Sequence, residues 1–210
     1  LATVALLGTS PMVISTHADQ PYKTFTDVAN AAKAGGKGIA YGTIGNGSLG
    51  HLAVTLLAKS AGLQMVHVPY KGGGPLMTDA VGGQVPLSIG TVFLVNPHVR
   101  SGRLRALAVT SRAPDAQMPG VAPVAEQGVA GFEALAWWGV FAPGATPPAL
   151  AQRIHEELAK ALKAPVVAEK LTAQGMDLVG GSPEVLDRFQ RAEIERWAKV
   201  VRENRIRAGD

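Results

Sequence analysis

The spacing of apolar residues changes repeatedly along the first half of the chain, between the two-residue period of strands and the longer period of helices. Strands alternating with helices of about ten residues are typical of βαβ crossovers, so residues 20–112 are predicted to form one α/β domain with a mainly parallel sheet. The expected strands are 39–41, 65–69, 85–89 and 104–110, and the expected helices are 25–34, 49–61, 75–81 and 93–100.

The opening residues 1–14 are apolar and resemble the hydrophobic core of a signal peptide. They lack a positively charged start, and Pro11 interrupts them, so a buried strand is the favoured interpretation. The chain begins with Leu1 rather than Met, which indicates a processed product or a fragment.

The second half has a different pattern. Residues 113–131, rich in Pro, Ala and Gly, are expected to be a surface connection. Residues 132–210 are expected to hold one strand, at 132–141, and three helices. The last helix, 182–204, has an apolar stripe that is expected to face mostly inward, formed by Leu186, Phe189, Ile194, Trp197 and Val201. One strand with three helices does not complete an α/β domain, so part of this domain is expected to be missing or supplied elsewhere.

The amino-acid composition excludes several classes of protein and of functional site. The 210 residues are 47% hydrophobic and 17% charged, which excludes general disorder. No cysteine is present, which excludes disulfides, thiolate zinc sites and a Cys nucleophile. The histidines show no metal-ligand spacing, and no cofactor or metal is predicted. No run approaches the ~20 apolar residues of a membrane-spanning helix.

Charge is uneven along the chain. Residues 1–110 carry eight Lys or Arg against three Asp, whereas the remainder carries twelve basic and thirteen acidic side chains. A basic half indicates an anionic partner. The basic residues are dispersed singly without interleaved aromatic residues, which argues against nucleic acid and favours a small organic anion.

A Gly-rich segment between a predicted strand and helix, from Tyr41 to Ser48, is the strongest chemical signal. Glycines allow backbone N–H groups to converge, and the helix N-terminus adds partial positive charge, so the segment suits an anion. Its glycine spacing fits neither the dinucleotide fingerprint nor a P-loop. A tight turn without a ligand is an equal alternative.

A second Gly-rich turn, from Pro69 to Pro75, also follows a strand and opens a helix. Ligands of doubly wound sheets collect at this edge. The Tyr70 hydroxyl and Lys71 ammonium make a carboxylate site plausible, although Lys71 is equally well explained as a solvated surface charge.

The sequence gives less support for catalytic residues than for an anion site at the two Gly-rich turns. Ser48 and His51 have helical spacing, but no acid stands near them in sequence and no G-x-S-x-G elbow is present. His67 is interpreted as a packed strand residue. One of Trp137 and Trp138 must point inward from a strand, so a core role is the default.

Several motifs, in order along nearly the whole chain, resemble the Bug receptors, the extracytoplasmic solute-binding proteins of tripartite tricarboxylate transporters. They are Gly-Asn-Gly-Ser48 with His51-Leu52, Val66-His-Val-Pro-Tyr-Lys-Gly72, Gly82-Gly-Gln84, Gly102 to Ser111, Phe132-Glu-Ala134, Trp138 to Pro143, and Ala192-Glu-Ile with Trp197. One departure lies in Val85 to Thr91, where family members often have acidic residues after the Val and at the position of Gly90.

The resemblance implies a periplasmic binding protein type II-like α/β fold. Residues 1–19 would be a crossover strand between lobes, 20–112 one complete lobe, 113–131 a connection and 132–210 the C-terminal part of the other lobe. A further N-terminal segment, absent here, would complete that lobe in the family, so self-association through the incomplete lobe is expected.

The resemblance also implies a periplasmic, non-catalytic receptor for a small organic carboxylate that works with membrane transporter subunits. The alternatives are a truncated relative that binds nothing alone and a Ser48/His51 hydrolase. The ligand-binding residues carried over from the family motifs are Thr43, Gly45, Asn46, Gly47, Ser48, Tyr70, Lys71, Gly72 and Thr91.

Overall fold

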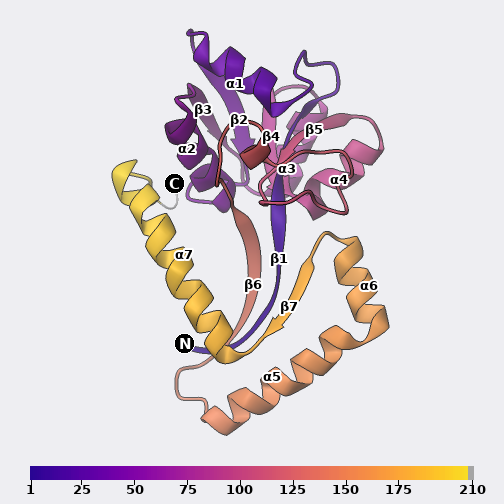
Figure 1. Ribbon diagram of the computed structural model, residues 1–210, viewed down its shortest axis with the longest axis vertical. Coiled ribbons are helices and arrows are strands. Elements are labelled where there is room, and N and C mark those ends of the chain that lie inside the picture. Colours follow the sequence, from indigo (N-terminus) through magenta and orange to yellow (C-terminus); the bar gives the residue numbers. More distant parts are fainter. Residues whose placement is uncertain (208–210) are drawn as a thin grey trace. The chain divides into compact units, whose positions relative to one another are not determined.

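The computed structural model describes residues 1–207, which form two compact units (Figure 1). Unit 1 contains residues 1–10 and 136–199, and unit 2 contains residues 11–135 and the chain from Val200. The long strand β1 (Ala2–His17) contributes its first part to unit 1 and its second part to unit 2. Of the expected last segment 132–210, residues 208–210 lie outside the described part of the chain.

The sheet of unit 2 has the order β3-β2-β4-β1-β5. Strand β2 is parallel to β3 and β4, as the βαβ pattern predicts. Strand β1 is antiparallel to β4 and β5, which the prediction of a mainly parallel sheet did not include. The reason is that β1 enters unit 2 at the edge where β4 ends, with Met12 opposite Thr91. The strands after β1 are Ile39–Thr43 (β2), Met65–Pro69 (β3), Leu87–Thr91 (β4) and Leu104–Val109 (β5).

Four helices of unit 2 connect these strands, and their ends follow from local chemistry. Thr24 and Asp27 form a capping box at the start of α1, as predicted. Gly62 ends α2 in the left-handed conformation, with φ 65°. Strand β4 begins two residues later than predicted because Pro86 has no N–H for the ladder. The helices are Phe25–Lys33 (α1), Leu49–Ala61 (α2), Gly73–Val81 (α3) and Val92–Arg100 (α4).

The segment expected to be a surface connection is packed into unit 2 instead. Met118 and Val124 are almost fully buried, and Met118 belongs to the same core cluster as Leu76. The Gln127 side chain donates to the Leu107 carbonyl and accepts from the Phe25 N–H. Sequence composition could not reveal this packing because the apolar residues of the segment have no regular period.

Thr110 joins the two stretches of chain that pass between the units. Its hydroxyl oxygen accepts from the Met12 N–H at 2.8 Å and lies 2.5 Å from the Ala134 carbonyl oxygen, to which it donates. Met12 lies at the start of the part of β1 in unit 2, and Ala134 immediately precedes β6. Both bonds are buried, so the two points lie side by side within unit 2.

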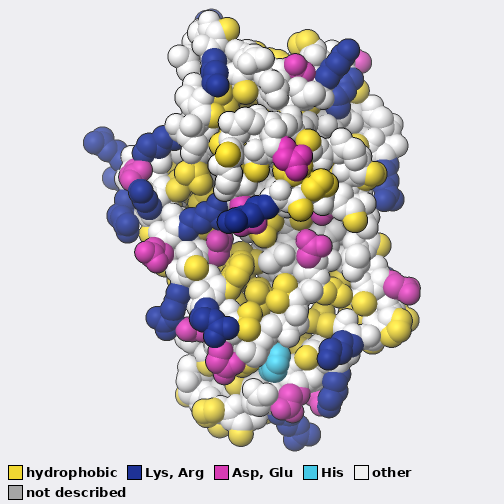
Figure 2. All heavy atoms as spheres, viewed as in Figure 1, with side chains coloured by type: hydrophobic (Ala, Val, Ile, Leu, Met, Phe, Trp, Pro, Cys, Tyr) yellow, Lys and Arg dark blue, Asp and Glu magenta, His cyan; other side chains and the backbone are white. Residues whose placement is uncertain are grey.

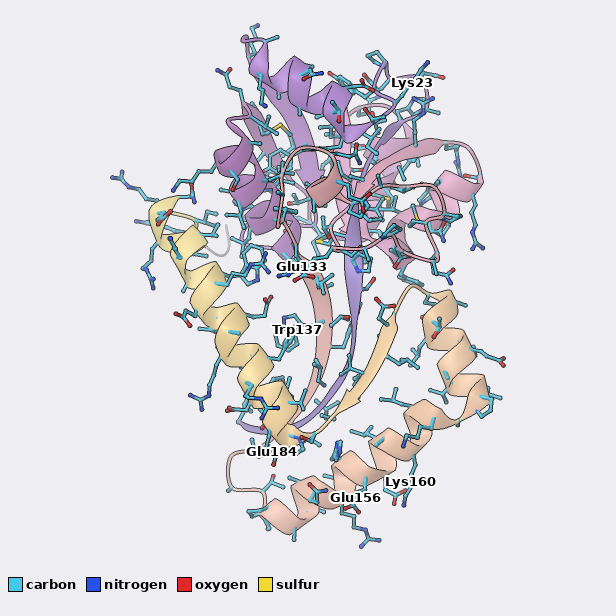
Figure 3. All side chains as sticks on the ribbon, viewed as in Figure 1. Lys23, Glu133, Trp137, Glu156, Lys160 and Glu184 are labelled. Carbon is cyan, nitrogen blue, oxygen red and sulfur yellow. The ribbon has the colours of Figure 1, made fainter. Side chains whose placement is uncertain are left out.

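Unit 1 contains three strands, because β6 (Leu135–Ala142) and β7 (Asp177–Gly181) both pair with β1. The sequence predicted β6 but missed β7, which is short and ends in two glycines. Trp137 lies between β6 and α7 (Figure 3), with its ring centroid 5.7 Å from that of Phe189. The expected inward role therefore belongs to Trp137, whereas Trp138 is 37% exposed.

The helices of unit 1 bury little apolar surface. They are Pro148–Lys163 (α5), Pro165–Ala173 (α6) and Pro183–Glu203 (α7). Helix α6 has no buried residue, and Val166 on it is 75% exposed. On α7, Leu186 is buried but Ile194 is 59% exposed, so the expected inward-facing stripe is wrong at Ile194. The described elements of unit 1 do not cover that side of the helix.

Gly42 on β2 gives a test of the packing beneath the Gly-rich turns. A Cβ at this position would lie 2.5 Å from the Leu76 side chain and 2.9 Å from the Tyr70 ring. Because Leu76 is fully buried, it cannot move aside. We expect Gly42→Ala to lower the free energy of unfolding by about 1–3 kcal/mol in urea denaturation.

Gly74→Ala is the matched control, because no heavy atom lies within 4 Å of the place that its methyl group would take. It should leave the unfolding free energy unchanged or slightly raised. Equal losses in both variants would contradict this account of the packing.

Candidate ligand site

The first Gly-rich turn runs from the end of β2 to the start of α2. Ser48 is the N-cap of α2, and its side-chain oxygen accepts from the His51 N–H at 3.4 Å, which agrees with the predicted cap. Gly45 and Gly47 have φ values of 141° and 70°, which only glycine adopts readily. The turn therefore requires glycine at both positions and delivers the chain directly into a helix N-terminus.

The second Gly-rich turn lies beside the first. The Tyr70 N–H donates to the Thr43 carbonyl at 2.9 Å, and the Gly72 N–H donates to the Ile44 carbonyl at 3.3 Å. Since β3, β2 and β4 are neighbours and parallel, helices α3, α2 and α4 all begin at this edge of the sheet (Figure 1). The edge thus combines three helix N-termini, each favourable for negative charge.

Side chains beneath the turn hold its shape. Thr43 is fully buried, and its hydroxyl donates to the Gly45 carbonyl and accepts from the Gly45 N–H. The same oxygen lies 2.7 Å from Nε2 of His67. The His67 ring stacks on the His51 ring, with centroids 3.8 Å apart and planes 11° apart. His51 Nδ1 in turn accepts from the Gly47 N–H at 3.2 Å.

Polar groups of three predicted ligand-binding residues are bonded within the protein. Thr43 lies below the turn, with its hydroxyl engaged. The Gly47 N–H, expected to point at an anion, is donated to His51. The Tyr70 hydroxyl donates to Asp79 on α3 at 3.0 Å. The sequence could not indicate these bonds, because they join residues of different elements or fold the turn onto its own helix.

Other predicted residues remain available at the edge. Asn46 and Lys71 are exposed, and Lys71 forms no ion pair within residues 1–207. The Ser48 oxygen accepts a hydrogen bond, which leaves its own proton free to donate. Thr91 caps α4 without a side-chain capping bond. Gly45 and Gly72 shape the backbone of the two turns.

The sequence analysis expected the N-terminus of α2 to suit an anion. Leu49 and Gly50 are the first two residues of α2, and N–H groups at these positions have no acceptor within their own helix. Gly50 is buried, so Leu49 is the more exposed of the two.

Both histidines beneath the turn favour the neutral form. Burial lowers the pKa of His51. Burial, with a smaller effect from the neighbouring His51, lowers the pKa of His67 to about 4. Burial and the bond to Asp79 raise the pKa of Tyr70. At neutral pH the two histidines beneath the turn are therefore uncharged.

Among the described residues, the Ser48 hydroxyl and the His51 ring are not hydrogen-bonded to each other. Nδ1 of His51 is occupied by the Gly47 N–H, and the Ser48 oxygen is bonded to the backbone N–H of His51. Within residues 1–207, no group of three His, Cys, Asp or Glu side chains is placed to hold a metal ion. No helix in the same range has the length and apolarity to cross a membrane.

Comparison with known sequences identifies the family of the chain. The chain matches the tripartite tricarboxylate transporter family receptor over residues 1–206. It belongs to that family. A Pseudomonas sp. (strain P51) protein, the UPF0065 protein in the tcbD-tcbE intergenic region, is 39% identical over 98% of this chain and 61% of its own length. Protein BugT of Bordetella pertussis is 34% identical over 97% of this chain and 62% of its own length. The chain thus spans about three fifths of these relatives.

Solved structures agree with the family and the fold. R. palustris Rpa4515 with adipate has a TM-score of 0.89 at 31% identity, covering 98% of this chain and 69% of the other. MatC from Rhodopseudomonas palustris with bound malate has a TM-score of 0.85 at 28% identity, covering 95% and 69%. The periplasmic binding protein BugD has a TM-score of 0.86 at 28% identity, covering 96% and 68%. The expected mixed α/β fold of periplasmic binding proteins is confirmed, as is the resemblance to Bug receptors.

The lowered pKa of His67 predicts a pH-dependent stability. Because folding favours neutral His67, the unfolded chain binds more protons between pH about 4 and the ordinary histidine pKa of about 6.5. The contribution of neutral His67 to the free energy of unfolding should be complete above this pH range and should be lost as the pH is lowered through it. His67→Gln, which retains a polar atom for Thr43, should flatten the fall measured by urea unfolding between pH 7 and 4.5.

His98→Gln, on α4, is the control and should retain the wild-type slope. A slope unchanged by His67→Gln would show that other groups cause the acid sensitivity.

Proposed function

We propose that this protein is a periplasmic receptor that binds a small organic carboxylate and works with the membrane subunits of a tripartite tricarboxylate-type transporter. The observation that carries the proposal is the joining of two Gly-rich turns, through the Tyr70 and Gly72 N–H bonds, at an edge where three helices begin. Neither catalysis nor a cofactor is part of this function. Unit 2, with its complete sheet, would be the intact lobe, and unit 1 the C-terminal part of the other lobe.

The chemistry of the edge suits a carboxylate. The first N–H groups of α2 and the Ser48 hydroxyl can donate to carboxylate oxygens, and the helix dipole favours their charge. Lys71, exposed on the adjoining turn, supplies a positive charge that no carboxylate of residues 1–207 neutralises. Asn46 and Thr91 add polar contacts at the rim.

Two observations point to a small ligand rather than a polyanion. The solved relatives were obtained with adipate and with malate, which are both dicarboxylates. On the face drawn in Figure 2, Lys and Arg side chains are interspersed with Asp and Glu and form no continuous basic stripe. Nucleic acid would require such a stripe. We therefore propose a dicarboxylate of adipate or malate size.

Replacing Ser48 tests the binding site. Isothermal titration of the 210-residue chain with adipate, malate, and other di- and tricarboxylates identifies the ligand. Ser48→Ala should then weaken binding by about 0.5–3 kcal/mol, the range for one hydrogen bond, with the upper part of the range applying to a charged partner. Lys71→Met should weaken binding and flatten its dependence on salt, because the screened charge is gone.

Ser60→Ala is the control, because Ser60 is exposed near the C-terminal end of the same helix. It should bind as the wild type does. Full affinity in Ser48→Ala would refute the site. The absence of heat with every acid would favour the alternative of a relative that does not bind alone, and turnover of carboxylate esters would favour the hydrolase.

Unit 1 supports a second part of the proposal, which is self-association through its uncovered surface. Val166, Ile194 and Trp138 are exposed, and hydrophobic side chains are visible over the strands of unit 1 in Figure 2. Strands β6 and β7 each pair only with β1 among the described residues, which leaves outer edges able to pair with another chain. Exposed apolar faces and open edges favour association.

Light scattering should therefore give a mass above the 21.7 kDa of one chain. Val166→Lys combined with Ile194→Lys should shift the population toward monomer, because charge opposes burial of these faces. Val66→Lys, at a similarly exposed apolar position of unit 2, should not. A stable wild-type monomer that unfolds cooperatively would contradict the proposed association.

A further inference from the structure

His51 and His67 are brought together from two different elements of unit 2. His51 lies in the first turn of α2, and His67 lies in the middle of β3. Their rings are nearly parallel, with centroids 3.8 Å apart. Stacking of two imidazoles at this distance is compatible with neutral rings, whereas two adjacent cations would repel. Neither ring is needed to close the core, since both side chains are only partly buried.

Each ring is bonded to a different point of the same Gly-rich turn. His51 Nδ1 accepts from the Gly47 N–H. His67 Nε2 bonds the Thr43 hydroxyl, which in turn binds both the N–H and the carbonyl of Gly45. The pair therefore holds the turn on both sides of Asn46, immediately before the helix N-terminus that is suited to an anion.

The bond to Gly47 fixes the protonation of His51. An imidazole nitrogen accepts a hydrogen bond only when it carries no proton, so the ring proton must be on Nε2. Protonation of Nδ1 replaces an acceptor with a donor facing the Gly47 N–H. The bond is then lost, and two N–H groups are directed at each other.

We propose that His51 and His67 are positioning residues that hold the Gly-rich turn in its ligand-ready conformation while the His51 ring is neutral, so that mild acid releases Gly47 and rearranges the turn. The proposal concerns the site of the proposed function but not the identity of its ligand. It makes the conformation of the turn, rather than the charge of Lys71 alone, the determinant of anion binding at low pH.

The titratable groups around the histidine pair come from β2, from α2, from α3 and from the turn after β3. From β2, the ring of Tyr41 lies 5.2 Å from that of His67, and burial raises the pKa of Tyr41. After β3, Tyr70 is bonded to Asp79 of α3. The next residue, Lys71, is exposed, and Lys59 on α2 pairs with Glu203. The burial that lowers the pKa of both histidines supports neutral rings at pH 7.

Nuclear magnetic resonance of the ligand-free 210-residue chain tests the proposal without requiring any ligand. At pH 7.5, the ¹⁵N shifts of His51 should show the Nε2–H form, and the Gly47 amide should be protected from hydrogen exchange. As the pH falls toward 4.5, the Gly47 amide shift should move with the midpoint of the His51 titration. The amide of Gly62, at the other end of α2, should not follow it.

Substitutions of the two histidines distinguish the hydrogen bond to Gly47 from a role of the side chains in packing alone. His51→Asn places an amide oxygen near the position of Nδ1 but cannot be protonated in this range, so Gly47 should stay protected at every pH. His51→Leu removes the acceptor, and Gly47 protection should fall about tenfold or more even at pH 7.5. His67→Gln keeps a polar partner for Thr43, and because burial lowers the pKa of His51, the Gly47 amide should still follow the His51 titration in this variant.

Two results would overturn the proposal: a Gly47 amide that does not follow His51, or a wild-type pH response retained in His51→Asn. The result with His51→Asn still decides the question if the His51→Leu variant does not fold. Titration with adipate at pH 7.5 separates this outcome from the proposed function. Absence of binding with a normal Gly47 titration counts against the receptor, whereas normal binding with an unresponsive Gly47 counts against the histidine pair.

Discussion

The candidate site depends on one buried residue, Thr43, which is the last residue of β2. Its carbonyl receives the Tyr70 N–H, and its hydroxyl bonds both Gly45 and His67. A fully buried hydroxyl must be hydrogen-bonded, so this group leaves the surrounding chain few alternative conformations. The strand end, both Gly-rich turns and the histidine pair are consequently fixed relative to one another. The groups left at the surface are those that an anion can reach.

Polar groups are divided at this edge between support and recognition. Thr43, His51, His67 and the Gly47 N–H are bonded to one another beneath and within the turn. Ser48, Lys71 and the first N–H groups of α2 remain available above it. Residues that contact a ligand can therefore be changed without disturbing the bonds that shape the backbone of the turn.

The sequence predicted much of unit 2 because its signals are local. Thr24 with Asp27, Ser48 and Gly62 act within one turn of the chain, so caps and helix ends were found. The family motifs also indicated the two Gly-rich turns, which lie side by side at one edge of the sheet. Sequence analysis did not reveal the side-chain bonds beneath the turn. The Thr43–His67 bond joins two strands, and the bond from the Gly47 N–H to His51 folds the turn onto its own helix. Strand β7 was missed because its pairing with β1, rather than its composition, makes it a strand.

Thr110 has a consequence for how such a chain could arise and be rearranged. It bonds Met12 and Ala134, so the two points where the continuous part of unit 2 begins and ends are adjacent. A domain whose ends meet can be inserted into a host chain without stretching either one. Residues 11–135 have this arrangement, with residues 1–10 and 136–199 as the interrupted host. In such an insertion, the same threonine hydroxyl would hold the two ends of the inserted segment together.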